Sequence, residues 1–373
     1  MIGLRRSPAL RGTVIALMAS AAALVVALVA VDAGSVEDGP KGVSNLVLKQ
    51  DLVLRVPSDV SLPTARPIVA RHASGRYVLV TADRYGLAVF DAAGRFERSI
   101  LVSRPPRGGT PGVRGTFISH VVSGPNSTLW LYLTDRTLVE LTDDLSLGRV
   151  RAMPYPPSFV RVDGTSIVAR QIPEPDLIGQ PIHLVGQDGS VRRSFGLDTA
   201  EYRRDLRLAL TRLVAPSRNG TVWSMAPGRY TIDRWRPEDG KRLETIALRS
   251  DWFVPSDRPV SDERQRPAPL VDSIWERDHG LFVLTRAADD RWQPPAHPNV
   301  ERPHDPRIYN ETFDWVVEAI DVAARIVIAS RRLSEAHWPT IPSGRLSSLT
   351  VGEAGAVTRI TLWSVHLQSE EGS

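Results

Sequence analysis

Short β-rich segments in which successive side chains point to opposite faces, with a period of two, recur along much of the chain. The clearest example is Gly75 to Ile100, GRYVLVTADRYGLAVFDAAGRFERSI. Short alternating runs rich in β-branched and aromatic residues, separated by turn residues, predict β-strands. This segment therefore predicts three strands joined by two turns, with Gly94 free to adopt a left-handed conformation in the second turn. Such a small meander cannot bury its own apolar face, so it needs neighbours of the same kind.

Weaker copies of the pattern follow as far as the C-terminus. They occupy segments 129–153, 164–195, 220–248 and 280–333, the last of which is interrupted by a long insertion. Their turn markers are Gly148, Gly189, Gly240 and Ala324, at the place that Gly94 holds in the first unit. Apart from the interrupted copy, the spacing between successive turn markers is close to the roughly 40–50 residues of a four-stranded propeller blade.

The two ends of the chain complete the count of strands. The C-terminal segment 346–367 supplies two strands around Gly355, and with a first strand near Ile341 this last unit lacks only its fourth strand. Segment 46–56, LVLKQDLVLRV, alternates well and belongs to no unit. Pairing the N-terminal strand with the C-terminal blade closes a ring and leaves no exposed edge. The sequence thus predicts an all-β fold, a six-bladed β-propeller closed by strand 46–56.

This fold prediction divides the chain into a leader and one domain. Residues 1–34 form a signal peptide or N-terminal membrane anchor, and residues 35–373 form the propeller. The predicted blades cover residues 66–104, 116–155, 158–199, 208–255, 268–333, and 338–367 together with 46–56. Segment 200–213 also has a helical pattern, from which we expect a short surface helix followed by an inner strand over 208–215.

Several of these segments resemble a known group of proteins. VFDAAGRFERSI, a Gly/Arg-rich link, PNSTLWLYL and HLVGQDGSVRRSFG resemble the exported bacterial six-bladed propellers related to NHL-type propellers, over residues 66–367. The resemblance rests on blade patterning and implies a fold far more than a function.

The N-terminal segment predicts export. Arg5, Arg6 and Arg11 lead into an uncharged run over 12–31, followed by a small-residue site that ends at Ala33. These are the parts of a secretory signal peptide. The run has the length of a membrane span of about 20 residues, so a retained anchor is the alternative. Either arrangement places the propeller outside the cytoplasm: periplasmic, extracellular, or held on the outer face of the inner membrane.

Composition removes several functional classes. The chain has no cysteine, which excludes disulfides, thiolate zinc sites and cysteine nucleophiles. The formal net charge is +4, and the arginines are interleaved with Asp and Glu rather than gathered in a basic stripe, so we expect no nucleic-acid partner. We expect a monomer that meets the membrane only through an uncleaved N-terminal segment.

No catalytic motif is present. The sequence contains no Gly-x-Ser-x-Gly elbow, His-Glu-x-x-His pair, phosphate-binding glycine loop or calcium-loop spacing, so we assign no catalytic residue, metal ligand or cofactor. His297, His304 and Asp305 could hold a metal, but they lie in a proline-rich stretch without regular geometry, which favours a solvated insertion.

Loop length indicates where binding occurs. In an up-and-down blade, the loop between the second and third strands and the loop to the next blade leave from the same face. The long stretches 104–115, 172–181, 251–269 and 288–311 all belong to these two classes. Long loops on a rigid scaffold commonly carry function. We therefore expect a binding face dominated by the fourth and fifth blades, with these candidate residues: Asp251, Trp252, Asp289, Asp290, Trp292, His297, His304 and Asp305.

Three functions remain open. The first is a non-enzymatic exported scaffold that binds a protein, peptide or glycan through that face. The second is a calcium-dependent lactonase or hydrolase, because gluconolactonases and paraoxonases have six blades and a calcium ion on the ring axis, although their motifs find no match here. The third is a structural module of an envelope assembly.

Overall fold

The computed structural model divides the chain into two compact units, Met1–Val43 and Ser44–Ser373. It describes residues 45–63, 66–103, 115–172, 174, 176–177, 179–196, 211–256, 265–277, 280–294, 312–352 and 356–368. The predicted leader, residues 1–34, lies outside these residues. Across the part of the chain that is described, no helix is long and apolar enough to cross a membrane.

Short strands make up almost all of the regular structure in the second unit. The first meander contains β2 (Val69–Arg71), β3 (Tyr77–Val80), β4 (Gly86–Phe90) and β5 (Phe96–Leu101). The second and third contain β6 (Ile118–Ser123), β7 (Leu129–Leu133), β8 (Thr137–Leu141), β9 (Leu147–Ala152), β10 (Phe159–Val160), β11 (Ser166–Ala169), β12 (Ile182–Val185) and β13 (Val191–Phe195). A 3-10 turn, η1 (Pro125–Ser127), precedes β7.

The remaining strands follow the same order. The fourth meander contains β14 (Leu213–Pro216), β15 (Val222–Met225), β16 (Thr231–Arg236) and β17 (Lys241–Ala247), and the fifth contains β18 (Leu270–Arg277), β19 (Gly280–Ala288), β20 (Phe313–Asp321) and β21 (Ile326–Leu333). The last sheet contains β22 (Trp338–Pro339), β23 (Arg345–Val351), β24 (Val357–Gln368) and the N-terminal strand β1 (Asn45–Arg55).

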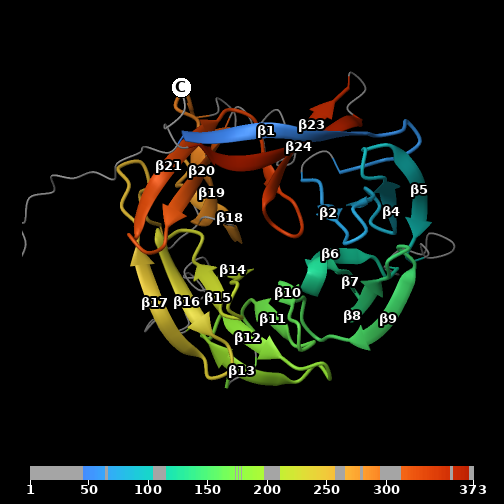
Figure 1. Cartoon of the computed structure of the whole chain (residues 1–373), viewed down its shortest axis with the longest axis horizontal. Helices are drawn as coiled ribbons and strands as arrows, with labels where there is room; N and C mark the ends of the chain where they lie inside the picture. The colour runs from blue at the N-terminus through green and yellow to red at the C-terminus, as the bar shows by residue number, and fades with distance from the viewer. Residues whose placement is uncertain are drawn as a thin grey trace, which may run out of the picture. The chain divides into compact units, whose positions relative to one another are not determined.

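Each meander pairs its four strands in chain order and antiparallel. The second and third meanders are joined into one eight-stranded sheet by a parallel bridge between Ser123 of β6 and Phe159 of β10. In the last sheet, β1 pairs antiparallel with β24, from Asn45 opposite Gln368 to Arg55 opposite Arg359. The two ends of the described chain therefore lie side by side in one sheet (Figure 1).

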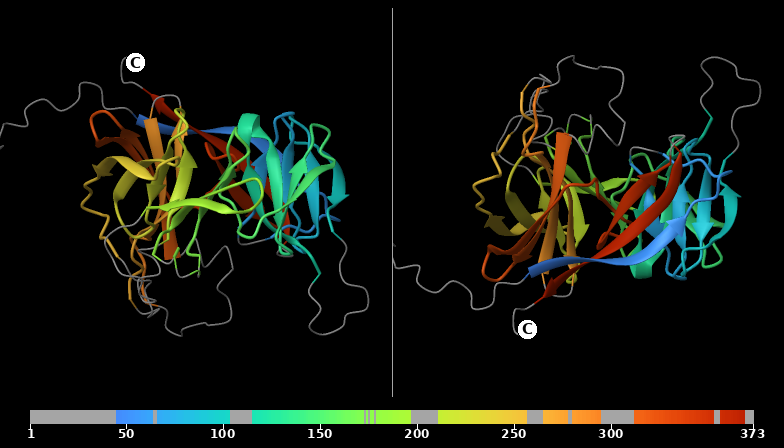
Figure 2. Two further views of the ribbon diagram at one scale, coloured as in Figure 1. Left: turned by 90° about the horizontal axis from the view of Figure 1, so that it is seen from below. Right: turned by 90° about the horizontal axis from the view of Figure 1, so that it is seen from above.

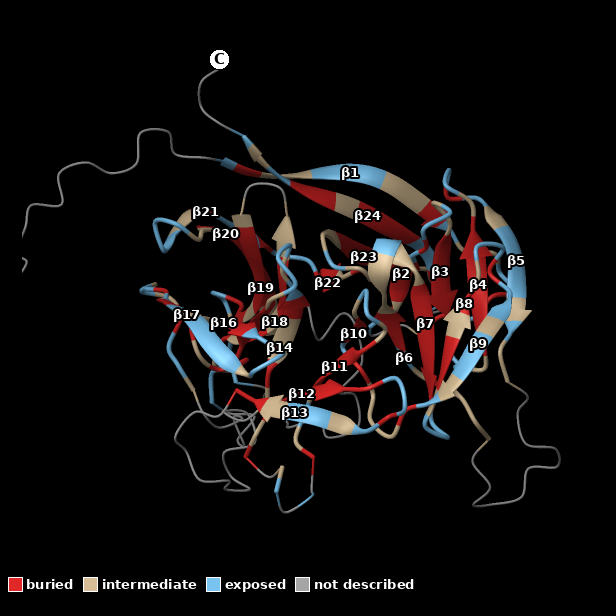
Figure 3. Ribbon diagram, turned by 60° about the horizontal axis from the view of Figure 1, so that its bottom comes forward, coloured by how far each residue is buried: buried red, intermediate tan, exposed pale blue. Residues whose placement is uncertain are grey.

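The apolar core lies between meanders, as the alternating pattern requires. Six clusters of buried side chains are present among the described residues, and each draws its members from two neighbouring meanders. One cluster joins the last sheet to the first, through Leu54 and Ile360 on one side and Leu79 and Phe90 on the other. The fourth strands β5, β9 and β17 are exposed at most of their positions, while β3, β4, β7 and β19 are largely buried (Figure 3).

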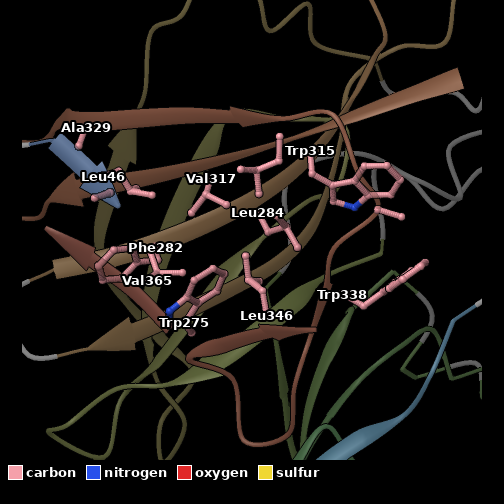
Figure 4. Packing of buried hydrophobic residues seen from close by; sticks show 13 residues of the cluster. Leu46, Trp275, Phe282, Leu284, Trp315, Val317, Ala329, Trp338, Leu346 and Val365 are labelled. Atoms are coloured by element: carbon pink, nitrogen blue, oxygen red, sulfur yellow. The ribbon is translucent and has the colours of Figure 1, made fainter. Parts of the chain in front are cut away.

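Aromatic side chains fill the cluster between the fifth and last sheets (Figure 4). Trp275 and Phe282 stack with ring centroids 5.6 Å apart and an interplanar angle of 9°. Trp315 meets Trp338 of the last sheet edge-on at 6.4 Å. Offset stacking and edge-to-face contacts add to the stabilisation that burial of these large rings provides.

The turns between third and fourth strands correct one detail of the sequence analysis. Gly94, Gly189 and Gly240 adopt positive φ angles, as predicted. Gly148 does not, because it lies within β9, and the left-handed residue of that turn is Leu145 (φ 65°). The side chain of Leu145 is fully buried in the core, and this packing offsets the conformational cost of about 1–2 kcal/mol.

The turn predicted around Ala324 needs a similar correction, because the left-handed residue there is Arg325 (φ 60°). The helix predicted in the first half of segment 200–213 lies outside the described residues. The inner strand expected over 208–215 is described only from residue 211, and β14 begins at Leu213.

Alternate turns of an antiparallel meander lie at opposite ends of its strands. We call one end the connection face: it carries the turns between second and third strands and the segments between meanders. The opposite face carries the turns between first and second and between third and fourth strands. Figure 2 shows the strands of the second unit from the side, running between these two ends.

Candidate functional site

The residues predicted between the fourth and fifth meanders have different surroundings. Asp251 is exposed, whereas Trp252 is half-buried against the core between these meanders. The Trp252 ring lies 6.1 Å from Tyr230 and 5.7 Å from Phe253. Most of the indole of Trp252 therefore packs on the protein rather than presenting a flat surface to a ligand.

The carboxylates at the end of β19 are engaged with arginines. Asp289 is only 3% exposed, and its Oδ1 accepts a hydrogen bond from the backbone N–H of Arg291 at 2.6 Å. Hydrogen bonds from the Arg291 side chain and backbone hold the pKa of Asp289 below its usual range. Asp290 pairs with Arg332 at 2.9 Å and with Arg266 at 3.6 Å.

Trp292, half-buried, follows directly and donates its backbone N–H to the carbonyl of Asp289. The structure therefore brings Asp289, Asp290 and Trp292 together as the base of a loop. His297, His304 and Asp305 lie outside the described residues, so the rest of the predicted set stays a prediction.

Metal chemistry finds no support in the described geometry. Within the ranges given above, no group of three or more His, Asp or Glu side chains is close enough to hold a metal ion. The first strands of the meanders carry two carboxylates there, Asp272 and Glu276, both on β18. Asp272 pairs with Arg286 at 2.9 Å, and Glu276 accepts a hydrogen bond from the Trp223 indole at 2.8 Å.

A cavity of about 440 Å³ opens on the opposite face, among the turns that follow β6, β10 and β14. Its volume falls in the range of small-molecule sites. The charged groups that line it are already paired, because Arg161 bonds to Glu238 and Arg218 lies 4.0 Å from Glu276. Two buried polar atoms of the lining, Nη1 of Arg161 and Oγ1 of Thr221, have no hydrogen-bond partner among the described residues.

A different group of side chains stands out on the connection face of the first three meanders. It consists of three arginines, two tyrosines and a histidine, which we call the arginine cluster: Arg84, Arg136, Arg170, Tyr132, Tyr155 and His120.

The centre of the arginine cluster is a pair of rings on neighbouring strands. His120 of β6 lies directly opposite Tyr132 of β7, and their ring centroids are 6.0 Å apart. The His120 Nδ1 is 2.9 Å from the hydroxyl oxygen of Ser119. Tyr132 is buried, whereas part of His120 remains exposed to solvent.

The three arginines come from separate turns on the same face. Arg84 lies in the turn after β3, Arg136 in the turn after β7, and Arg170 directly follows β11. All three are exposed, and no carboxylate among the described residues forms an ion pair with any of their guanidinium groups.

Electrostatic effects confirm that these groups influence one another. Crowding by protein atoms lowers the pKa of His120, and the positive charges of Arg170 and Arg84 lower it further. Burial raises the pKa of Tyr132, while Arg136 and Arg170 act in the opposite direction. His120 is therefore neutral at pH 7, and one ring nitrogen can donate a hydrogen bond while the other accepts one.

Two further side chains, those of Tyr155 and His183, form hydrogen bonds at the edge of the arginine cluster. The Tyr155 hydroxyl donates a hydrogen bond to Glu174, and this bond, followed by burial, raises the pKa of Tyr155. His183 is fully buried, and its Nε2 lies 3.0 Å from the carbonyl oxygen of Arg170. Because a carbonyl only accepts, Nε2 carries the proton and Nδ1 accepts from the Ser194 hydroxyl at 2.7 Å.

Sequence reasoning did not find the arginine cluster. Its arginines come from three separate repeats and look like ordinary turn residues of an Arg-rich chain. A signal was present at two positions, because Arg84 and Arg136 occupy turn positions where a glycine would be unstrained. Recognising it requires an alignment of the repeats to within one residue.

Comparison with known proteins supports the fold. No family model matches the chain, and no curated protein matches it in sequence. Among solved structures, a member of the DUF4221 family from Bacteroides vulgatus is similar with a TM-score of 0.55 at 11% identity, over 87% of this chain and 99% of the other. A protein from Bacteroides fragilis that is presumed to be exported is similar with a TM-score of 0.52 at 12% identity, over 87% and 95% of the two chains.

At these identities the similarity concerns the fold alone. The strand order, the packing of apolar clusters between consecutive meanders and these structural neighbours agree with one another. The chain has an all-β fold of the β-propeller type.

Proposed function

We propose that this protein is an exported six-bladed β-propeller that binds a ligand on its connection face, at the arginine cluster, and does not catalyse a reaction. The observation that carries the proposal is the contact between His120 and Tyr132, together with three nearby arginines that form no ion pair with a described carboxylate. Exposed polar groups gathered from several loops of a rigid scaffold are typical of binding sites.

The six-bladed architecture is supported by the strand pairing. The eight-stranded sheet consists of two four-stranded meanders, so the sheets together contain six units of four strands. The pairing of β1 with β24 supplies the fourth strand of the last unit, and the cluster around Leu54 packs that unit on the first. Export is supported by the basic and apolar character of the N-terminal segment and by the description of one structural neighbour.

Non-enzymatic binding is the function that fits the chemistry of the site. His120 is within reach of a serine hydroxyl, but Ser119 is its own sequence neighbour and no carboxylate among the described residues orients the imidazole. A Ser-His-Asp catalytic triad needs a carboxylate as its third group, because the carboxylate orients the histidine.

A ligand screen by thermal unfolding tests the proposal. The panel contains neutral oligosaccharides, short peptides, organic acids, phosphate and calcium, each added to the domain that starts at Ser44. A ligand present at 100 times its dissociation constant adds about 2.7 kcal/mol to the free energy of unfolding. We expect at least one class to raise the unfolding temperature, and His120→Ala to abolish the increase.

His366→Ala is the matched control for this screen. His366 is also exposed on a strand and also lies within hydrogen-bond distance of a serine hydroxyl, that of Ser364 at 2.6 Å, but it belongs to the last sheet. The His366→Ala variant should keep the full ligand-induced increase in unfolding temperature. No increase with any class, or an equal loss in both variants, would contradict a binding function at the arginine cluster.

A further inference from the structure

We propose that the ligand of the arginine cluster is a small multivalent oxyanion, a compound with at least two carboxylate or phosphate groups. The inference rests on the proposed binding function and specifies its chemistry. A guanidinium group has five N–H donors and no acceptor, and its planar fork matches carboxylate and phosphate oxygens. Three such groups without ion-pair partners therefore favour an anion with several oxygen atoms.

The nearby carboxylates do not supply those oxygens. Asp83 accepts a hydrogen bond from the backbone N–H of Tyr85 at 3.0 Å, and Asp135 accepts one from that of Thr137 at 3.1 Å. Glu174 accepts a hydrogen bond from the hydroxyl of Tyr155. Each acid is thus directed at an amide or hydroxyl group rather than at an arginine.

Arginines elsewhere on the connection face differ in their pairing. Arg291 and Arg332 of the fifth meander bond to Asp289, Asp290 and Asp314 at distances from 2.6 to 3.2 Å. Two exposed arginines on this face, Arg249 and Arg359, have no ion-pair partner among the described residues. The arginine cluster is therefore distinguished by the gathering of three such side chains near one pair of rings, and not by the absence of ion pairs alone.

The backbone at each unpaired arginine is fixed. The carbonyl of Arg84 accepts from the N–H of Ile118 at 2.8 Å, and that of Arg136 accepts from the N–H of Met153 at 2.7 Å. The carbonyl of Arg170 is held by His183. Anchored backbones limit the entropy lost when the side chains close on a ligand, which favours affinity.

Backbone strain provides an independent observation. Arg84 and Arg136 have φ angles of 62° and 67°, a conformation that costs a non-glycine residue about 1–2 kcal/mol. Glycine would remove that cost, and the presence of arginine there is consistent with a role for its side chain. Arg325 is also left-handed, but it lies 3.8 Å from Glu244 and so has a partner within the fold.

The arrangement also indicates that the ligand has more than one anionic group. The three arginines come from the first, second and third meanders, and their charges act on the His120–Tyr132 pair. A single carboxylate can engage one guanidinium fork face-on. A compound with two or three oxyanion groups can engage several at once, and the neutral imidazole of His120 can donate or accept one further hydrogen bond.

Isothermal titration at low ionic strength tests the inference with defined probes. The probes are citrate, pyrophosphate and acetate, and the proteins are the wild-type domain and its Arg84→Gln, Arg136→Gln and Arg170→Gln variants. We expect citrate or pyrophosphate to bind, acetate to bind at least tenfold more weakly, and each substitution to weaken binding by about tenfold or more, which corresponds to about 1.4 kcal/mol. The stronger of citrate and pyrophosphate distinguishes a carboxylate ligand from a phosphate ligand.

Arg359→Gln is the matched control, because Arg359 is an exposed arginine of β24 without an ion-pair partner among the described residues. It should keep the wild-type affinity within twofold, and unchanged unfolding temperatures will show that all four variants fold. Anion binding that resists all three substitutions would overturn the inference. If no anion binds but a neutral ligand still requires His120, the anionic ligand is wrong and the binding function stands; if nothing binds, both fail.

Discussion

Glu318 shows at the scale of one residue how this fold treats a buried charge. Its side chain is 2% exposed on β20, and its Oε2 accepts a hydrogen bond from the Tyr230 hydroxyl. Burial raises the pKa of Glu318 to about 7, although a hydrogen bond from Ser330 acts in the opposite direction. The group is therefore held close to its titration point at physiological pH.

This pKa predicts a pH dependence of stability. Because the folded pKa exceeds that of the unfolded chain, Glu318 favours folding most below about pH 4.5, and this contribution is lost as the pH rises to about 7. Glu318→Gln keeps an acceptor for Tyr230 and removes the titration. Urea unfolding at pH 5 and pH 8 should show the variant gaining up to about 3 kcal/mol relative to wild type at the higher pH. Equal differences at the two pH values would contradict the assignment.

Single residues also limit what the sequence alone can show about the site. The arginines of the cluster are unremarkable in a chain whose 46 basic residues are nearly all arginine. Only contacts distinguish Arg84, Arg136 and Arg170 from paired arginines such as Arg332. Conversely, Asp289 looked like a candidate ligand by its loop position, but its carboxylate serves the turn and the adjacent Arg291.

At the scale of elements, short apolar runs bounded by turn residues predicted the strands, because each meander buries both sides of its middle strands. Turn positions were less predictable. Gly148 suggested a turn, yet Leu145 takes the left-handed position because its side chain fills the core. A turn residue is therefore selected by packing as well as by φ, and packing depends on segments distant in sequence.

The turn at Gly94 makes contact with β1, and this contact predicts a difference between two glycines. A Cβ at Gly94 (φ 81°) would lie 2.4 Å from the carbonyl oxygen of Val53. Gly220 has a similar φ of 72° but nothing within 4 Å of its Cβ position. Both alanine variants incur the left-handed cost of about 1–2 kcal/mol, and Gly94→Ala must also displace β1.

We therefore expect Gly94→Ala to lower the free energy of unfolding by at least about 1 kcal/mol more than Gly220→Ala does. Urea unfolding of the two variants beside wild type measures the difference. Equal losses would show that β1 does not pack on this turn as described.

At the scale of the whole molecule, the fold class could be predicted from the sequence, whereas the arginine cluster could not, for one physical reason. A repeated strand pattern is a local property that each unit displays independently, and the pairing of β1 with β24 follows from counting strands. A binding site assembled from three repeats depends on which turns meet and which charges stay unpaired. The connection face was predicted from loop length, and the arginine cluster lies on it, but on the first three meanders rather than the fourth and fifth.

The central claim is that the arginine cluster is where a ligand binds, and histidine-ring NMR of the wild-type domain tests it most directly. The chain has eight histidines, and His120 and His366 can be assigned from their alanine variants. As the best ligand of the screen is added, the ring signals of His120 should shift progressively to saturation while those of His366 stay in place. A ligand that saturates the protein and leaves the His120 signals unchanged would contradict the account.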